Sequence, residues 1–354
     1  MSIVLPPIRT TGLTLGKFAP LHRGHQLLIE TALAEVDHLI VIIYDSPLVT
    51  PVPLPLRSAW LRALYPQLTV IEAWGGPQEV GDTPIIQQQH EAYIAALLGD
   101  QHITHFYSSE FYGAHMSRAL HAVDRRVDPA RATVPISATR IRADSYAHRA
   151  YLHPRVYRDL VTNVVVLGAP STGKTTLAAR LAALYQTHWM PEYGREFWEQ
   201  HQHARRLTPA QLVTIAETHL AREEQLLCEA RQYLFTDTNA LTTAIFALDY
   251  HGAVLPRLAQ LADAAATRYD LVLLCDTDIP YDATWDRSGA VQRHTFQQRI
   301  IADLVLRNIP YITIRGTLDA RVAQVQRVLA YYRPYHSLTD LLWAANEGNH
   351  NESV

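Results

Sequence analysis

Gly-Ala-Pro-Ser-Thr-Gly-Lys-Thr, at residues 168–175, divides the chain and decides the fold of its second half. The apolar run 164–167 before it predicts a buried strand, and the run 176–185 after it predicts a helix. A glycine-rich turn in this place points successive backbone N–H groups inward, beside the positive end of the helix dipole. A plain glycine-rich turn before a buried helix is the alternative, but motif and flanks together favour a phosphate cradle.

The residue types in this stretch have separate tasks. Lys174 can reach the terminal phosphates of a nucleotide, and the hydroxyl of Thr175 can ligate Mg²⁺. The stretch is a P-loop motif in its required context, and it predicts ATP and Mg²⁺ as cofactors. The residues expected to contact the nucleotide are Gly168, Ser171, Thr172, Gly173, Lys174, Thr175 and Thr176.

Composition limits the class of protein. A chain of 354 residues suggests about two domains, and 48% apolar with 18% charged residues is ordinary for a globular core. The net charge of −3 gives no basic footprint, so nucleic acid is not an expected partner. Two distant cysteines, no signal pattern and no apolar run near the roughly 18 residues of a membrane span predict a cytoplasmic protein without a membrane partner. A homo-oligomer is compatible with the sequence.

The first half begins with a strand–helix–strand pattern at 13–15, 26–36 and 38–44. Gly-Lys-Phe-Ala-Pro-Leu-His-Arg-Gly-His, at 16–25, lies between its strand and helix. His22 and His25 flank the helix N-terminus, where imidazoles can hold phosphate oxygens and donate hydrogen bonds to developing charge. Alone, a pair of satisfied surface histidines would be an equally good interpretation.

A second phosphate-binding segment is predicted at 136–142, Ile-Ser-Ala-Thr-Arg-Ile-Arg. Ser137 and Thr139 are helix-cap residue types that can also bind phosphate, and Arg142 supplies positive charge. An ordinary helix cap with a solvated arginine is the alternative.

Two further strands end in polar residues. The run 105–107 leads to Ser108, Ser109 and Glu110, which are predicted substrate contacts because ligands bind at the carboxyl ends of parallel strands. A polar turn would have the same composition. The strand 233–237 ends in Asp237, which is predicted to bind Mg²⁺ or to accept a hydroxyl proton, with a helix cap as the alternative.

Together these motifs resemble the bifunctional NadR family, which joins a nicotinamide-nucleotide adenylyltransferase to a ribosylnicotinamide kinase. The resemblance runs from about Gly12 to Tyr335. It implies two parallel-sheet α/β domains, a Rossmann-like nucleotidyltransferase with a His-x-Gly-His motif at 1–161 and a P-loop kinase at 162–340, with a tail at 341–354. Many members carry an N-terminal helix-turn-helix domain, and the roughly ten residues before the first strand here are too few for one.

The resemblance also implies site residues and reactions. In the first domain it adds Gly16, Lys17, Phe18 and Gly24 to the nucleotide site. In the second it implies substrate contacts at Glu192, Tyr193 and Arg195, and a lid at 277–289 with Arg287 or Arg293 on the phosphates. The expected reactions are phosphorylation of ribosylnicotinamide and adenylyl transfer to nicotinamide mononucleotide, giving NAD and pyrophosphate. Other acceptors on the same folds, or a nucleotide sensor, are the competing interpretations.

Overall fold

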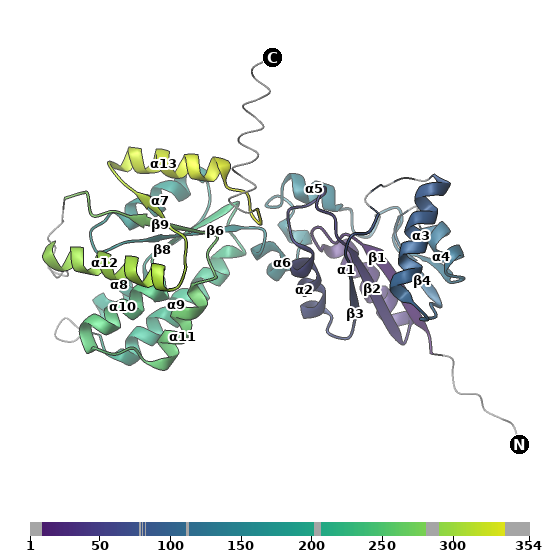
Figure 1. Cartoon of the computed structure of the whole chain (residues 1–354), viewed down its shortest axis with the longest axis horizontal. Helices are drawn as coiled ribbons and strands as arrows, with labels where there is room; N and C mark the ends of the chain where they lie inside the picture. Colours follow the sequence, from purple (N-terminus) through teal and green to yellow (C-terminus); the bar gives the residue numbers. More distant parts are fainter. Residues whose placement is uncertain are drawn as a thin grey trace, which may run out of the picture. The chain divides into compact units, whose positions relative to one another are not determined.

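The chain forms two compact units, which we describe separately. The computed structural model describes residues 9–77, 79, 81, 83–110, 113–201, 207–280 and 290–336. The first unit is Met1–Tyr157 and the second is Arg158–Val354 (Figure 1). The sequence predicted the boundary after residue 161, which is four residues beyond the division after Tyr157. Arg287 and the expected tail at 341–354 lie outside the described residues.

The first unit is built on a five-stranded parallel sheet in the order β3-β2-β1-β4-β5. Its strands are β1 (Thr11–Gly16), β2 (His38–Tyr44), β3 (Thr69–Ala73), β4 (His105–Ser108) and β5 (Val123–Arg126). Its helices are α1 (Arg23–Glu35), α2 (Leu54–Leu64), α3 (Pro84–Leu98), α4 (Gly113–Ala119), α5 (Ala138–Ala143), the 3₁₀ turn η1 (Arg149–Tyr151) and α6 (Pro154–Arg158). The buried apolar run 39–43 in β2 is the pattern of a strand covered on both faces.

The strand order reverses direction at β1. Since β1 pairs with β2 on one side and with β4 on the other, the loops after β1 and β4 leave the same edge of the sheet in diverging directions. A crevice forms at such a switch point, outside the carboxyl ends of the strands. The motif at 16–25 and the residues after β4 are therefore brought to one place.

The second unit is also built on a five-stranded parallel sheet, with the order β10-β9-β6-β8-β7. Its strands are β6 (Thr162–Leu167), β7 (Trp189–Met190), β8 (Tyr233–Asp237), β9 (Leu271–Cys275) and β10 (Ile312–Ile314). Its helices are α7 (Lys174–Tyr185), α8 (Tyr193–His201), α9 (Pro209–Leu227), α10 (Ala240–His251), α11 (Pro256–Ala265), α12 (Ala290–Leu306) and α13 (Leu318–Tyr331).

Alternating side chains of the central strand β6 fill two core layers. Val164 and Val166 pack with residues of α7 and α13, whereas Val165 and Leu167 pack with residues of α10, α11 and α12. Figure 1 shows α7 and α13 on one side of this sheet and α10 and α11 on the other. Burial of β6 on both faces explains why its sequence is continuously apolar and fixes the starting point of the P-loop.

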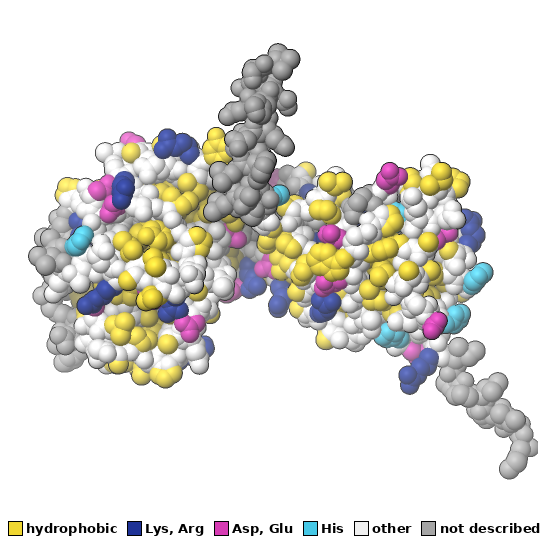
Figure 2. Space-filling model, viewed as in Figure 1, with side chains coloured by type: hydrophobic (Ala, Val, Ile, Leu, Met, Phe, Trp, Pro, Cys, Tyr) yellow, Lys and Arg dark blue, Asp and Glu magenta, His cyan; other side chains and the backbone are white. Residues whose placement is uncertain are grey.

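The predicted fold class, two parallel-sheet α/β domains, is confirmed. The first helix begins earlier than its predicted start at residue 26: α1 begins at Arg23 because His22 caps it. In the same way α3 begins at Pro84, where the side chain of Thr83 accepts a hydrogen bond from the backbone N–H of Ile86. The charged strand β5 had no apolar signal and was not predicted. No helix in the described ranges is long and apolar enough to cross a membrane. On the face shown in Figure 2, basic and acidic side chains lie interspersed in small groups.

Two candidate nucleotide sites

The two histidines of the first unit begin helix α1 with reciprocal hydrogen bonds. Nδ1 of His22 accepts from the backbone N–H of Gly24 at 3.1 Å, and the backbone N–H of His22 donates to Nδ1 of His25 at 3.3 Å. This arrangement is a capping box made by imidazoles. Because each Nδ1 accepts, the proton of each neutral ring lies on Nε2, which becomes a hydrogen-bond donor.

Burial keeps both rings uncharged. It lowers the pKa of His22 to about 4, with a smaller contribution from the charge of Arg131. The pKa of His25 is held well below its usual value, again mainly by burial, then by His22 and Arg131. The rings stack with their centroids 3.8 Å apart. At neutral pH the pair therefore offers two fixed N–H donors rather than two cations.

Positive charge comes from neighbouring groups. Arg142 donates from Nη1 to the carbonyl oxygen of Ala19 at 2.6 Å and from Nη2 to Oγ1 of Thr139 at 3.1 Å. It thereby holds the loop after β1 against α5, whose N-terminus Ser137 caps. Burial and the charge of Arg142 lower the pKa of Lys17, as expected for cations gathered at one site.

A cavity of about 330 Å³ lies at the carboxyl ends of β1, β2 and β4. It brings together nine sequence-predicted residues, which are Ser109 and the following eight: Gly16, Lys17, Phe18, His25, Glu110, Ser137, Thr139 and Arg142. His22 and Gly24 are not in its wall and act from behind, through the cap. Ser108 is buried against Gly113 and is not in the wall either.

Several lining residues of this cavity were not predicted from the sequence. They are Tyr44, His90, His115 and Arg131. Arg131 carries the clearest signal, because it follows a turn set by Asp128, whose carboxylate accepts from the N–H groups of 132, 133 and 134. An Asp-Pro turn ahead of the predicted phosphate segment could have indicated it.

The P-loop of the second unit adopts the conformation that its glycines allow. Gly168 and Gly173 have φ angles of 147° and 78°, and Gly173 is the N-cap of α7. Nζ of Lys174 donates to the carbonyl oxygen of Ala169 at 3.1 Å, as does Oγ1 of Thr172 at 2.8 Å. The lysine ammonium thus lies across the mouth of the cradle.

Asp237 lies beside this cradle. Oγ1 of Thr175 donates to its Oδ2 at 2.5 Å, and the side chain is fully buried. Burial, followed by the nearby charge of Glu192, raises the pKa of Asp237 from 3.8 to about 6. Among the described residues its Oδ1 has no hydrogen-bond partner. A buried carboxylate oxygen without a partner, next to a threonine hydroxyl, is suited to a cation with oxygen ligands.

The second cavity, of about 360 Å³, extends from the P-loop to α8, α9 and α10. It brings together nine predicted residues: Gly168, Ser171, Thr172, Gly173, Lys174, Thr175, Thr176, Glu192 and Arg195. Tyr193 is not in its wall, since its ring packs against Phe197 and lies 4.1 Å beneath the guanidinium of Arg222. Arg293 points into the protein, as described below.

The far wall of the second cavity is aromatic and apolar. It includes Trp198, Leu212, Ile215, Phe246 and Tyr250, none of which was predicted. At helical spacing such residues are indistinguishable from ordinary core residues. The arrangement is that of a phosphate cradle joined to a chamber for a flat organic group.

Comparison with known proteins agrees with both halves. A family model described as cytidylyltransferase-like matches residues 13–144, and one described as an AAA domain matches residues 163–321. The chain thus joins a nucleotidyltransferase-type domain to a P-loop kinase-type domain. It is 28% identical over 326 residues to the Trifunctional NAD biosynthesis/regulator protein NadR of Escherichia coli (strain K12), covering 86% of this chain and 79% of that protein. The protein of the same name from Salmonella typhimurium is also 28% identical, with 87% and 79% covered.

Solved structures give the same result for the fold. A crystal structure of NadR in complex with NAD and AMP-PNP superposes with a TM-score of 0.54 at 22% identity, covering 91% of this chain and 96% of that one. A structure of NadR in complex with NR superposes with the same values. The resemblance to NadR predicted from the motifs is confirmed.

Proposed function

We propose that this protein carries out two consecutive reactions of NAD salvage. The second unit phosphorylates the 5′-hydroxyl of ribosylnicotinamide with ATP, and the first transfers AMP from ATP to the resulting nicotinamide mononucleotide, giving NAD and pyrophosphate. The observation that carries the proposal is the presence of two separate phosphate cradles, each at a strand-order switch point, in a chain similar to NadR along most of its length. Both reactions use ATP in solution, and we place them in the cytoplasm.

In the kinase reaction the P-loop would hold the phosphates of ATP against N–H groups and Lys174. The residues present fit Mg²⁺, because the Thr175 hydroxyl, the free carboxylate oxygen of Asp237 and phosphate oxygens are the ligands this ion prefers. No cluster of three or more His, Cys, Asp or Glu suited to a metal occurs in the described ranges, so phosphate and hydroxyl ligands are needed. Bound Mg²⁺ would neutralise charge on the transferred phosphoryl group. The aromatic chamber would take the nicotinamide ring, with Glu192 and Arg195 at the sugar and phosphate.

In the adenylyl transfer the mononucleotide phosphate would attack the α-phosphorus of ATP while the bond to pyrophosphate breaks. The Nε2–H group of His25 would donate to oxygens on which charge develops, and His22 would hold the start of α1 through the cap. Lys17, Arg142 and Arg131 would surround the leaving pyrophosphate. No residue needs to form a covalent intermediate, since positioning and charge stabilisation are sufficient.

A product assay tests the proposal. Purified protein is incubated with ribosylnicotinamide, ATP and Mg²⁺, and the products are separated by chromatography over time. We expect nicotinamide mononucleotide first and NAD afterwards. Absence of the mononucleotide refutes the kinase assignment. Absence of NAD when mononucleotide is supplied refutes the transferase assignment.

A further inference from the structure

Two buried arginines from different helices bind successive carbonyl groups of the P-loop. Arg293, on α12, donates from Nη2 to the carbonyl oxygen of Ser171 at 3.2 Å. Arg321, on α13, donates from Nη1 to the carbonyl oxygen of Thr172 at 2.6 Å. The two side chains belong to residues only 6% and 2% exposed, so neither guanidinium is a solvated surface group.

These contacts fix the orientation of two peptide planes. A trans peptide is planar, so the carbonyl oxygen of one residue and the N–H of the next point in opposite directions. Holding the Ser171 and Thr172 oxygens toward the arginines therefore turns the N–H groups of Thr172 and Gly173 the other way, into the cradle. Rotation of either plane would instead present an oxygen to the phosphates.

The backbone at this point needs such support. Ser171 has a φ of 62° and Gly173 a φ of 78°, so left-handed residues lie on both sides of Thr172. A left-handed conformation at a serine is unfavourable and persists only where the surroundings impose it. Two charge-assisted hydrogen bonds to adjacent carbonyls supply that constraint.

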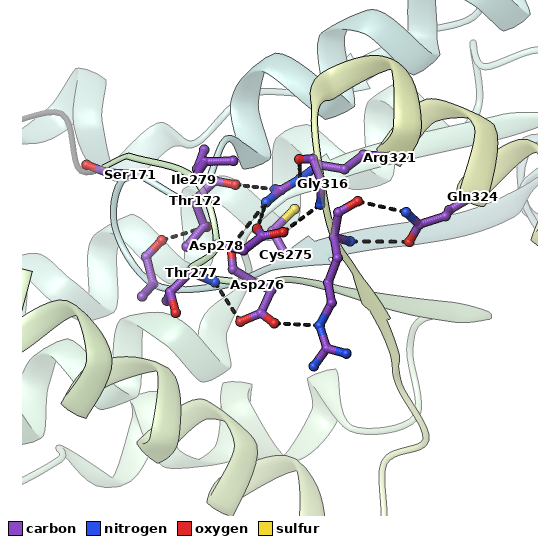
Figure 3. A network of polar contacts seen from close by, with 12 residues as sticks. Ser171, Thr172, Cys275, Asp276, Thr277, Asp278, Ile279, Gly316, Arg321 and Gln324 are labelled. Carbon is purple, nitrogen blue, oxygen red and sulfur yellow. Dashed lines mark hydrogen bonds and ion pairs between the residues drawn. The ribbon is translucent and has the colours of Figure 1, made fainter.

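Other donors of Arg321 bind Gly316 and the segment after β9 (Figure 3). Arg321 donates from Nη2 to the carbonyl oxygen of Asp276 at 3.3 Å and to the carboxylate of Asp278, and from Nε to the carbonyl oxygen of Gly316 at 2.8 Å. The second carboxylate oxygen of Asp278 accepts from the N–H of Gly316 at 2.5 Å. Arg293 donates from Nη1 to the carbonyl oxygen of Ile279 at 3.0 Å. Residues 276–279 thus hold the two arginines in the positions from which they bind the P-loop.

We propose that Arg293 and Arg321 are positioning residues of the kinase site that prepare the cradle for the polyphosphate of ATP. This inference rests on the proposed kinase function and adds to it. It replaces the sequence-based expectation for Arg293, which does not cover the transferred phosphate from a lid but acts from behind the loop. Neither arginine is among the residues that line the cavity beside the P-loop, so the predicted effect is specific for phosphate.

The test compares phosphate with the rest of the substrate in kinase assays of the full chain. Arg321→Gln is expected to raise the KM for ATP and the inhibition constant of tripolyphosphate by about 10–100-fold. The KM for ribosylnicotinamide and the inhibition constant of adenosine are expected to stay within about twofold of their original values, because those groups bind elsewhere. Arg293→Gln is expected to behave in the same way. Arg327→Gln, at an exposed position of α13, is the matched control.

Further controls distinguish a positioning role of the two arginines from a general loss of folding. Adenylyl transfer to supplied mononucleotide, measured in the same samples, checks that each variant retains a working first unit. Arg321→Lys keeps the charge without the planar fork and is expected to give an intermediate KM for ATP; it replaces Arg321→Gln if that variant unfolds. Equal losses for tripolyphosphate and adenosine, or Arg321 variants that match the control, would overturn the proposal.

Failure of the proposed function has a different signature. If the unchanged chain does not phosphorylate ribosylnicotinamide, calorimetric binding of tripolyphosphate with Mg²⁺ gives the same comparison, with Lys174→Ala as the blank. Weaker binding by the Arg321 and Arg293 variants than by the control supports the proposal, and equal binding overturns it.

Discussion

Replacing Asp237 by asparagine is expected to stabilise the second unit above pH 6 while removing kinase activity. The carboxyl is fully buried, and its pKa is raised from 3.8 to about 6. Because the folded pKa is the higher one, the folded state prefers the protonated form. Above pH 6 the group is ionised in both states and the folded state carries the whole penalty; below 3.8 it carries none.

The magnitude follows from these two values. Their difference of about 2 corresponds to about 3 kcal/mol at pH 8, and the same relation leaves about 1 kcal/mol at pH 4.5. An asparagine amide oxygen can still accept the hydrogen bond from Thr175, so packing is retained. The free energy of unfolding of the variant should therefore exceed that of the original chain by about 3 kcal/mol at pH 8 and by much less at pH 4.5.

The measurement is urea unfolding of the full chain at both pH values. Monitoring it by hydrogen exchange in peptides of α7 and β8 gives the free energy of unfolding of the second unit separately. Glu229→Gln, which changes an exposed carboxyl of the same unit, is the matched control. An Asp237→Asn variant that is less stable at pH 8, or that gains equally at both pH values, would refute the reasoning.

Two other substitutions test the two sites, and a third, with its partner substitution, tests the packing of the first unit. Lys174→Ala should abolish mononucleotide formation and leave NAD synthesis from supplied mononucleotide largely intact; comparable loss of both, in a folded protein, would contradict two independent cradles. His25→Ala should lower kcat for adenylyl transfer on the order of 10²-fold while phosphorylation continues, and normal NAD synthesis would show that the ring is only structural. Gly113→Ala would place a Cβ 2.1 Å from Oγ of Ser108, and should destabilise the first unit by about 1–3 kcal/mol in thermal unfolding. Ser108→Ala in the same background should recover part of that loss, and additive effects would exclude the clash.

The sequence predicted features that short segments encode. The strand, glycine turn and helix around Lys174 lie within about two dozen consecutive residues, and local chemistry alone specifies that cradle. The continuous apolar runs of β2 and β6 likewise predicted parallel strands covered on both faces.

Contacts between distant residues could not be predicted in this way. Arg293 and Arg321 reach the P-loop from 122 and 149 residues away, and nothing in the helices that carry them distinguishes them from solvated arginines. The chamber wall around Phe246 has the spacing of core residues, so its exposure to a cavity depends on how α8, α9 and α10 pack. Tyr193 is the opposite case. The motif predicted it as a substrate contact together with its neighbours, which face the cavity, but its own ring packs beneath Arg222.

The imidazole cap of α1 has a consequence for attempts to engineer this protein. Serine, threonine, aspartate and asparagine are the preferred first residues of a helix, and their introduction is a routine way to raise thermal tolerance. At position 22 that improvement would discard the ring whose Nδ1 starts the helix and whose Nε2 carries the proton. Replacing His25 would remove the ring nitrogen that accepts the hydrogen bond from the backbone N–H of His22. Thermostabilising searches that rank positions by local helix preference should therefore leave both positions untouched.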